Sequence, residues 1–427
     1  MKYSDSFLLF LMIPAKNKQF YQFCAYGFLK NLRFFDPFLL LFFLSKGFSY
    51  IDIGLLYAVR EIGFVLTEIP SGIFADAFGR KKSLIFSYIA YLVSFLAFYL
   101  SDSFLPVAFA MLLFSLGESF RSGTHKAMIF SYLEHNNWTK YKTDYYGNTR
   151  ACSQMGSAVS AALAAIIVIL SPKLELIFLF SIIPYLFGLI NLALYPNYID
   201  KINKQQSIKD LLKESLKLTR LSWQLFKQKK MILAVINLSF YTSYYKSVKD
   251  YFQILIISFG SGLIVIEKFN LDQQNAFLIG IAYTLLYFLT SLASRKSQRF
   301  QNIFKSETKA LNLSIFFGIL IGAISGLFLW LDFKLLAIIL FFSVYIIENL
   351  RKPIGISHVI DYSNEKINAT VLSVSSQMEA LIAAIIAVYI GFVAEHYSVG
   401  LALFSASLVL LLFWPVYWLK DRAKQHG

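Results

Sequence analysis

The sequence predicts an all-α membrane protein whose twelve transmembrane helices form two six-helix bundles. Three observations lead to this fold class: the composition, the spacing of the apolar runs and an internal repeat. Of the 427 residues, 57% are hydrophobic and 17% are aromatic, and the mean hydropathy is +0.59. Soluble domains contain about 45–50% apolar residues. This composition therefore excludes a soluble multidomain protein.

The apolar runs are long enough to cross a membrane. A bilayer core about 30 Å thick requires roughly 20 apolar residues in each helix. Short polar breaks separate the predicted spans, which lie at 22–45, 52–75, 83–100, 104–130, 148–170, 175–195, 232–258, 272–294, 310–331, 334–360, 368–391 and 398–419.

The longest polar break divides six spans from six. It predicts an N-terminal bundle at 1–195, a basic linker at 196–231 and a C-terminal bundle at 232–427. Leucine and isoleucine recur in the linker at helical spacing, with lysine and arginine on the opposite face. This pattern is typical of an amphipathic helix that lies on an anionic lipid surface. A regulatory, calmodulin-like target segment is the alternative.

The formal net charge of +15 is distributed among the loops. A nucleic-acid-binding face would be continuous, so this distribution excludes nucleic acid as a partner and points to membrane lipid. Basic residues gather in alternate connections, and the positive-inside rule then predicts that both termini are cytoplasmic, in an inner (cytoplasmic) membrane. The two cysteines lie in apolar runs without zinc-like spacing, so no metal site is expected from them.

The two halves of the sequence resemble each other. The segment ESFR at 118–121 returns as ENLR at 348–351, and SQMGSAVSAALAAI from 153 is matched by SQMEALIAAIIA from 376. Such a repeat indicates a duplication. Two parallel six-span halves are one of the repeat layouts of secondary transporters.

The loop between spans 2 and 3, GIFADAFGRKKS, resembles the G-x-x-x-D-x-x-G-R-[RK]-x signature of the major facilitator superfamily, and its drug-efflux-like or uncharacterised bacterial branch in particular. The matching residues are Gly72, Asp76, Gly79, Arg80 and Lys81. The resemblance implies that this loop latches the cytoplasmic gate. The corresponding loop of the second half, SLASRKSQRF, lacks the aspartate and both glycines. The alternative is that the glycines form a tight turn and that the basic residues only fix the orientation of the chain in the membrane.

Nine charged residues lie well inside four predicted spans, where each costs on the order of 3 kcal/mol on insertion scales. The resemblance implies that spans 1, 4, 7 and 10 line a central cavity, so these residues are predicted to bind substrate or couple protons. Their i,i+3 or i,i+4 spacing places opposite charges on one helix face. Local ion pairs that lower the cost of insertion are the alternative. The nine are Arg33, Asp36, Glu118, Arg121, Lys246, Lys249, Asp250, Glu348 and Arg351.

Several further residues are secondary candidates. Glu61, Glu68, Arg150 and Glu379 are predicted to make contacts between the halves. His125 with Lys126, and His358 with Asp361, suggest gating contacts or a proton relay near the inner ends of spans 4 and 10.

The sequence contains no phosphate-binding loop, no H-E-x-x-H and no G-x-S-x-G elbow, so neither catalysis nor ATP-driven pumping is expected. The predicted function is secondary transport without a cofactor by a monomer, with proton-coupled efflux of a small amphiphilic or drug-like molecule as the leading version. Two alternatives stay open: proton-coupled uptake of a nutrient or siderophore-like acid, and a transporter-like receptor without flux.

Overall fold

The regular secondary structure of the described residues is helical. A computed structural model describes residues 17–138, 142–171, 173–200, 229–261, 269–304, 306–362 and 368–420, and no strand occurs in these ranges. Seven helices of the described chain are long and apolar enough to cross a membrane, with shorter apolar helices at Asp36–Ser45 and Val399–Leu412. The all-α class is confirmed, and the count of twelve crossings stays a prediction. Most of the predicted amphipathic linker, 201–228, lies outside the described residues.

The described residues up to 200 are called the first half here, and those from 229 onward the second half. Helices of the first half are α2 (Lys18–Lys30), η1 (Asp36–Phe38), α3 (Leu39–Ser45), α4 (Tyr50–Phe78), α5 (Arg80–Leu100), α6 (Phe104–Arg121), α7 (Thr124–His135), α8 (Lys142–Leu170), α9 (Leu176–Ala193) and η3 (Asn197–Ile199). Helices of the second half are α11 (Lys229–Val248), η4 (Lys249–Tyr251), α12 (Phe252–Gly260), α13 (Leu271–Arg295), α14 (Ser297–Ile303), α15 (Glu307–Trp330), α16 (Lys334–Ile360), α17 (Asn368–His396), α18 (Val399–Leu412) and α19 (Trp414–Tyr417).

Four of the predicted spans are interrupted rather than continuous, and span 12 breaks at Phe413, between α18 and α19. Span 1 breaks between α2 and η1, where Pro37 lacks a backbone N–H and stands near the start of the new helix. Span 4 breaks at Gly123, whose φ of +67° is left-handed and suits glycine. Span 7 changes to a 3₁₀ turn at Lys249–Tyr251. In spans 1, 4 and 7 the charged residues therefore lie close to the point where the regular α-helix stops, a feature typical of transporter binding sites.

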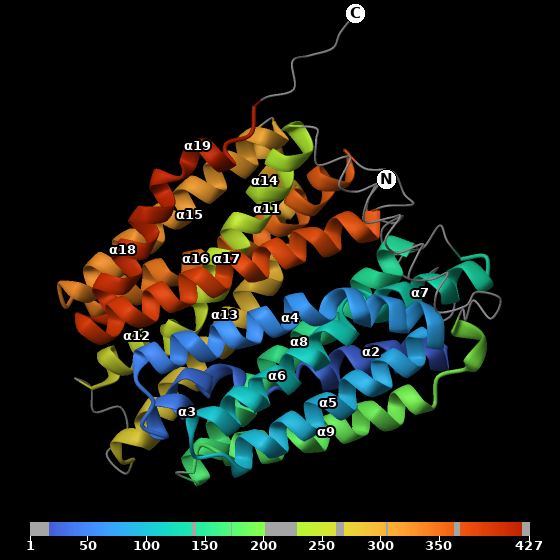
Figure 1. The fold of residues 1–427 in the computed structure, drawn as a ribbon, viewed down its shortest axis with the longest axis horizontal. Helices are drawn as coiled ribbons and strands as arrows, with labels where there is room; N and C mark the ends of the chain where they lie inside the picture. Colours follow the sequence, from blue (N-terminus) through green and yellow to red (C-terminus); the bar gives the residue numbers. More distant parts are fainter. Residues whose placement is uncertain are drawn as a thin grey trace, which may run out of the picture.

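The two halves pack along two pairs of long helices. In Figure 1 the yellow-to-red helices lie mainly above the blue-to-green ones, with α17 beside α4, and α13 packs against α8. Close approach requires small residues: a Cβ added at Gly54 would lie 2.6 Å from the carbonyl oxygen of Ala387. At Gly280 it would collide with the Cβ of Ala165. Small residues thus bring the two halves together.

Serine hydroxyls tie helices together within each half. In the first half, Ser87 donates to the carbonyl oxygen of Gly117 at 2.6 Å, and Ser83 and Ser94 make similar bonds from α5 to α6. In the second half, Ser243 donates to the carbonyl oxygen of Glu379 at 2.8 Å, flanked by bonds from Ser239 and Ser247 to α17. Hydrogen bonds between helices stabilise packing where hydrophobic burial cannot, because lipid is also apolar.

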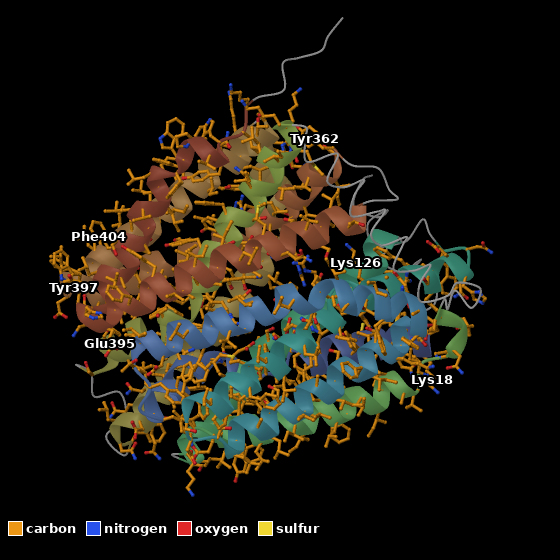
Figure 2. The ribbon with its side chains drawn as sticks, viewed as in Figure 1. Lys18, Lys126, Tyr362, Glu395, Tyr397 and Phe404 are labelled. Atoms are coloured by element: carbon orange, nitrogen blue, oxygen red, sulfur yellow. The ribbon has the colours of Figure 1, made fainter. Side chains whose placement is uncertain are left out.

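The molecule has two ends along the direction of the long helices. One end carries Gly54 and Glu395 and is called the Gly54 end; the other carries the GIFADAFGRKKS loop and α7 and is called the motif end. In Figure 2 the label of Glu395 lies towards the left, whereas those of Lys126 and Lys18 lie towards the right.

Candidate functional site

A cavity of about 430 Å³ lies between the two halves and is called the central cavity. Its walls come from the break after α2, from α4 and α6, and from α11, α16 and α17 of the second half. Ten of its lining residues are charged, six basic and four acidic: Arg33, Asp36, Arg60, Glu61, Glu118, Arg121, Lys246, Lys249, Lys352 and Glu379.

Glu118 is the centre of a charged cluster in the first half. Its carboxylate forms ion pairs with Arg33 and with Arg121, the latter at 2.6 Å between Oε2 and Nη2. The hydroxyl of Tyr91 donates to Oε1 at 2.6 Å. The expected pairing of Glu118 with Arg121 at i,i+3 is therefore found, and the break between α2 and η1 adds Arg33. Since these groups are largely shielded from water, the two arginines depend on Glu118 for neutralisation.

Asp36 occupies the break of span 1 at the start of η1 and lines the central cavity. Its expected partner Arg33 pairs with Glu118 instead and also donates from Nε to the hydroxyl of Tyr185 at 2.9 Å. No ion pair or hydrogen bond of the Asp36 carboxylate is found among the described residues, while its backbone carbonyl accepts from Gln253 at 3.3 Å. Asp36 is therefore a cavity carboxylate that remains available to a proton or a ligand.

A second charged cluster joins the two halves. Lys246 on α11 lies 3.6 Å from Glu61 on α4 and 3.7 Å from Glu379 on α17, measured from Nζ to Oε2 in both cases. Arg60 binds the other oxygen of Glu61 at 3.0 Å, and Lys352 lies 3.9 Å from Glu379. The expected partner of Lys246 was Asp250, four residues along the same helix. The structure thus replaces that local pair with one that crosses the interface.

The other two predicted site residues of span 7, Lys249 and Asp250, differ in whether they line the central cavity. Lys249 lines the central cavity and forms an ion pair with Asp250 at 3.1 Å. Asp250 is buried, with 3% of its surface exposed, and it is not among the lining residues.

Glu348 and Arg351 also point away from the central cavity. Arg351 is fully buried and donates to the backbone and side-chain oxygens of Asn237 at 2.8 and 2.9 Å. Glu348 accepts from Thr242 at 2.9 Å and lies 3.7 Å from Lys352, so the expected Glu348–Arg351 pair is not formed. The repeated ESFR and ENLR segments therefore differ: the first serves the cavity and the second anchors α16 to α11.

Among the charged residues of the cavity, sequence reasoning missed two, Arg60 and Lys352. The sequence contained a signal for each of them, because each is the direct neighbour of a candidate residue: Arg60 precedes Glu61, and Lys352 follows Arg351. Successive side chains of an α-helix point in directions about 100° apart. A step of one residue therefore decides whether Arg351 or Lys352 faces the cavity.

The loop between α4 and α5 makes its described contacts within the first half. Gly79 has φ +100°, and a Cβ there would collide with the carboxylate of Asp200. Arg80 donates to the hydroxyl of Ser131 at 2.8 Å, and Lys81 donates to the carbonyl oxygen of Tyr195 at 2.7 Å. Asp76 is exposed at the end of α4. The loop is thus docked on α7 and on the segment after α9.

The fold and cavity agree with the sequence comparison. A family model of the Major Facilitator Superfamily matches residues 20–387. The chain belongs to this superfamily. It is 25% identical over 406 residues to an uncharacterised MFS-type transporter, YxaM, of Bacillus subtilis (strain 168), with 92% of each chain covered. As a superfamily member the chain is a multi-pass membrane transporter, and membership implies no enzyme activity.

Solved structures share the fold of this superfamily member. The nucleoside transporter NupG matches with a TM-score of 0.68 and 13% identity, over 94% of this chain and 97% of that one. The D-xylose-proton symporter matches with a TM-score of 0.67 and 10% identity, over 94% and 96%. At such identities the likeness concerns the fold alone.

Proposed function

We propose that this superfamily member is a proton-coupled secondary transporter of a small amphiphilic molecule that carries an acidic group. The observation that supports it is the central cavity, which combines charged and aromatic walls between the two halves. Basic residues outnumber acidic ones there, and Phe35, Phe64 and Phe114 contribute aromatic rings. A ligand with an anionic end and an apolar ring or chain matches this lining, because each end finds its own kind of partner.

Alternating access requires one end to be closed while the other opens. At the Gly54 end, the backbone N–H of Tyr50 donates to Glu395 at 2.7 Å, and that of Leu41 donates to Gln253 at 3.2 Å. Gln273 reaches the carbonyl oxygen of Ile169 at 3.0 Å. Each of these bonds joins the two halves. They support the interpretation that the Gly54 end is the closed gate and that the cavity is reached from the motif end.

The rocking units in this proposal are 1–195 and 232–427, joined by the linker 196–231. The motif end faces the cytoplasm, as the distribution of basic loops predicts. The molecule as described then has its cavity directed inward.

Asp36 is the proposed proton carrier. Of the four carboxylates predicted to couple protons, Asp250 and Glu348 do not line the cavity, and Glu118 is held by two arginines. Asp36 lines the cavity, forms no ion pair with a described residue and stands at a helix break, where a small backbone motion changes its surroundings. A proton on Asp36 would remove one negative charge, raise the net charge of the cavity by one unit and thereby link proton and substrate occupancy.

Export is the proposed direction, because EIPSGIFADAFGRKKS resembles drug-efflux-like members of the superfamily. Import is the second candidate, and it is favoured by the fold likeness to the D-xylose-proton symporter. Both directions use the same cavity and differ in which gradient drives the cycle.

Purified protein in vesicles tests this function. A pH-sensitive dye inside the vesicles reports proton movement while a panel of aromatic and aliphatic carboxylates is added outside. The proposal expects proton movement that depends on one or more of these compounds and is absent from empty vesicles. Ligand binding without proton or solute movement would instead indicate a receptor.

A further inference from the structure

A second pocket of about 310 Å³ lies inside the first half, towards the motif end, and is called the basic pocket. Its walls are formed by α2, the start of α7 and the first part of α8. It adjoins the central cavity at Arg121 and Gly123, which line both. Among the described residues no acidic side chain lines it, whereas five of its lining residues are basic or histidine: Lys30, Arg121, His125, Lys126 and Arg150.

The basic pocket differs from the central cavity in whether its basic residues are paired with acids. Of the basic residues that line the central cavity, Arg33 and Arg121 pair with Glu118, Arg60 and Lys246 pair with Glu61, and Lys249 and Lys352 also pair with acids.

Lys30 and Arg150 in the basic pocket form no ion pair with an acid of the described chain. The ammonium of Lys30 lies 5.8 Å from the ring centre of Tyr26, a contact that leaves its three N–H donors for another partner. Lys30 is partly buried, and burying its charge without a matching acid is costly unless an anion binds.

The backbone adds to the same electrostatic pattern. Helix α7 begins at Thr124 after the left-handed Gly123, and no side chain caps its N-terminus. The first residues of α7, His125 and Lys126, line the basic pocket, so the positive end of a twelve-residue helix borders the same space. Free N–H groups at a helix start favour anions.

The ring of His125 is held in place at the wall of this pocket. It stacks on Tyr26 with ring centres 3.6 Å apart, and its Nε2 is 3.1 Å from the hydroxyl of Tyr195. Phe23 packs edge-on against the same imidazole at 5.5 Å. The pocket therefore has a rigid aromatic wall beside its cations and can receive an organic anion as well as an inorganic one.

We infer that the basic pocket is a binding site for the phosphate or carboxylate group of an anion, separate from the central cavity. Lys30 and Arg150 are the residues assigned to it, and Arg121 links it to the cavity. Two sources could supply this chemistry: a soluble organic anion that reaches the motif end, or the headgroup of an anionic lipid. The inference does not rest on the proposed function, because binding is measured without flux.

The test measures binding to the purified full chain in a neutral detergent. The probes are inorganic phosphate and phenyl phosphate, followed through the melting temperature and by equilibrium dialysis of radiolabelled phosphate. The variants are Lys30→Gln and Arg150→Gln, with Lys46→Gln and Arg295→Gln as matched controls at other places. Because Arg150 is exposed, Arg150→Gln keeps the test valid if Lys30→Gln fails to fold.

We expect each pocket variant to raise the dissociation constant of a phosphate probe about tenfold or more, because bonds to charged groups are the stronger ones. The controls leave it unchanged, and Lys30→Arg restores binding. A second arm compares vesicles of phosphatidylcholine with and without phosphatidylglycerol. Stabilisation by phosphatidylglycerol alone, lost in both variants, assigns the site to lipid headgroups. Binding that both variants leave unchanged, or no binding in either arm, overturns the inference.

Discussion

Glu61 on α4 and Lys246 on α11 face each other across the interface between the two halves, with 3.6 Å between Oε2 and Nζ. Each half contributes one charge, so any motion that widens the cavity must separate them. Lys246 also lies 3.7 Å from Glu379 of its own half, which can keep it neutralised when Glu61 moves away. The cluster is therefore suited to change partners during a cycle without leaving an isolated charge.

Neutralising Glu61 weakens the link between the halves. Glu61→Gln leaves Lys246 with Glu379 alone and leaves Arg60 without its acid, so the balance between the two cavity states shifts. We expect substrate-dependent proton movement to fall roughly tenfold, the effect of about 1.4 kcal/mol. Vesicle assays measure it, with Asp102→Asn as the control because Asp102 is an exposed partner of Lys46. Equal activity of both variants would show that the cluster takes no part in the transport cycle.

Asp36→Asn tests the proton carrier. The amide keeps the size of the side chain and removes its ionisation, so we expect net transport driven by a pH gradient to be lost while exchange of substrate across the membrane persists. Both are measured in the same vesicles with labelled substrate. If Asp36→Asn retains gradient-driven accumulation, another carboxylate carries the proton.

The glycine contact at the Gly54 end predicts a gating defect. A Cβ at Gly391 would collide with the carbonyl oxygen of Tyr50 and lie 3.2 Å from the Cα of Gly54. We expect Gly391→Leu to prevent closure of this end and to abolish transport, although the protein still reaches the membrane. Gly147→Leu is the matched control, because nothing lies within 4 Å of a Cβ at that position. Surface labelling of single cysteines near Tyr50 reports whether the end is open.

The loop at the motif end predicts that substitutions in the two corresponding loops have unequal effects on transport. Asp76→Asn removes the exposed acid of the signature, and we expect it to reduce transport severalfold. Arg295→Gln changes the corresponding loop of the second half, which lacks the aspartate, and should have much less effect. Initial rates of both variants at matched expression measure the difference. A larger loss in Arg295→Gln would contradict the gating role of the first loop.

The sequence was informative about helices because hydropathy and helix length are local properties. Each predicted span overlaps a helix of the described chain, and the charged residues of span 4 do face the cavity. The helix breaks at Pro37 and Gly123 were not predicted, although both residues are visible in the sequence. An apolar run retains its hydropathy whether or not the helix inside it is interrupted.

Partner choice within the site could not be predicted from spacing. The i,i+3 and i,i+4 spacing identified Glu118 with Arg121, where both residues share a face of one helix. It failed for Arg351, which binds Asn237 of α11, and for Lys246, which pairs across the interface. Those contacts depend on how helices far apart in the sequence rotate and pack. Local periodicity does not specify that rotation.

The central claim is that the two halves alternate between closing the Gly54 end and closing the motif end. Spin labels on a cysteine-free background test it directly, with one pair at Phe78 and Ile303 of the motif end and another at Asp102 and Tyr397 of the Gly54 end. All four positions are exposed. In vesicles moved from neutral to acidic pH, the account predicts a shorter motif-end distance and a longer Gly54-end distance. Unchanged distances at both ends, in vesicles that transport substrate, would contradict it.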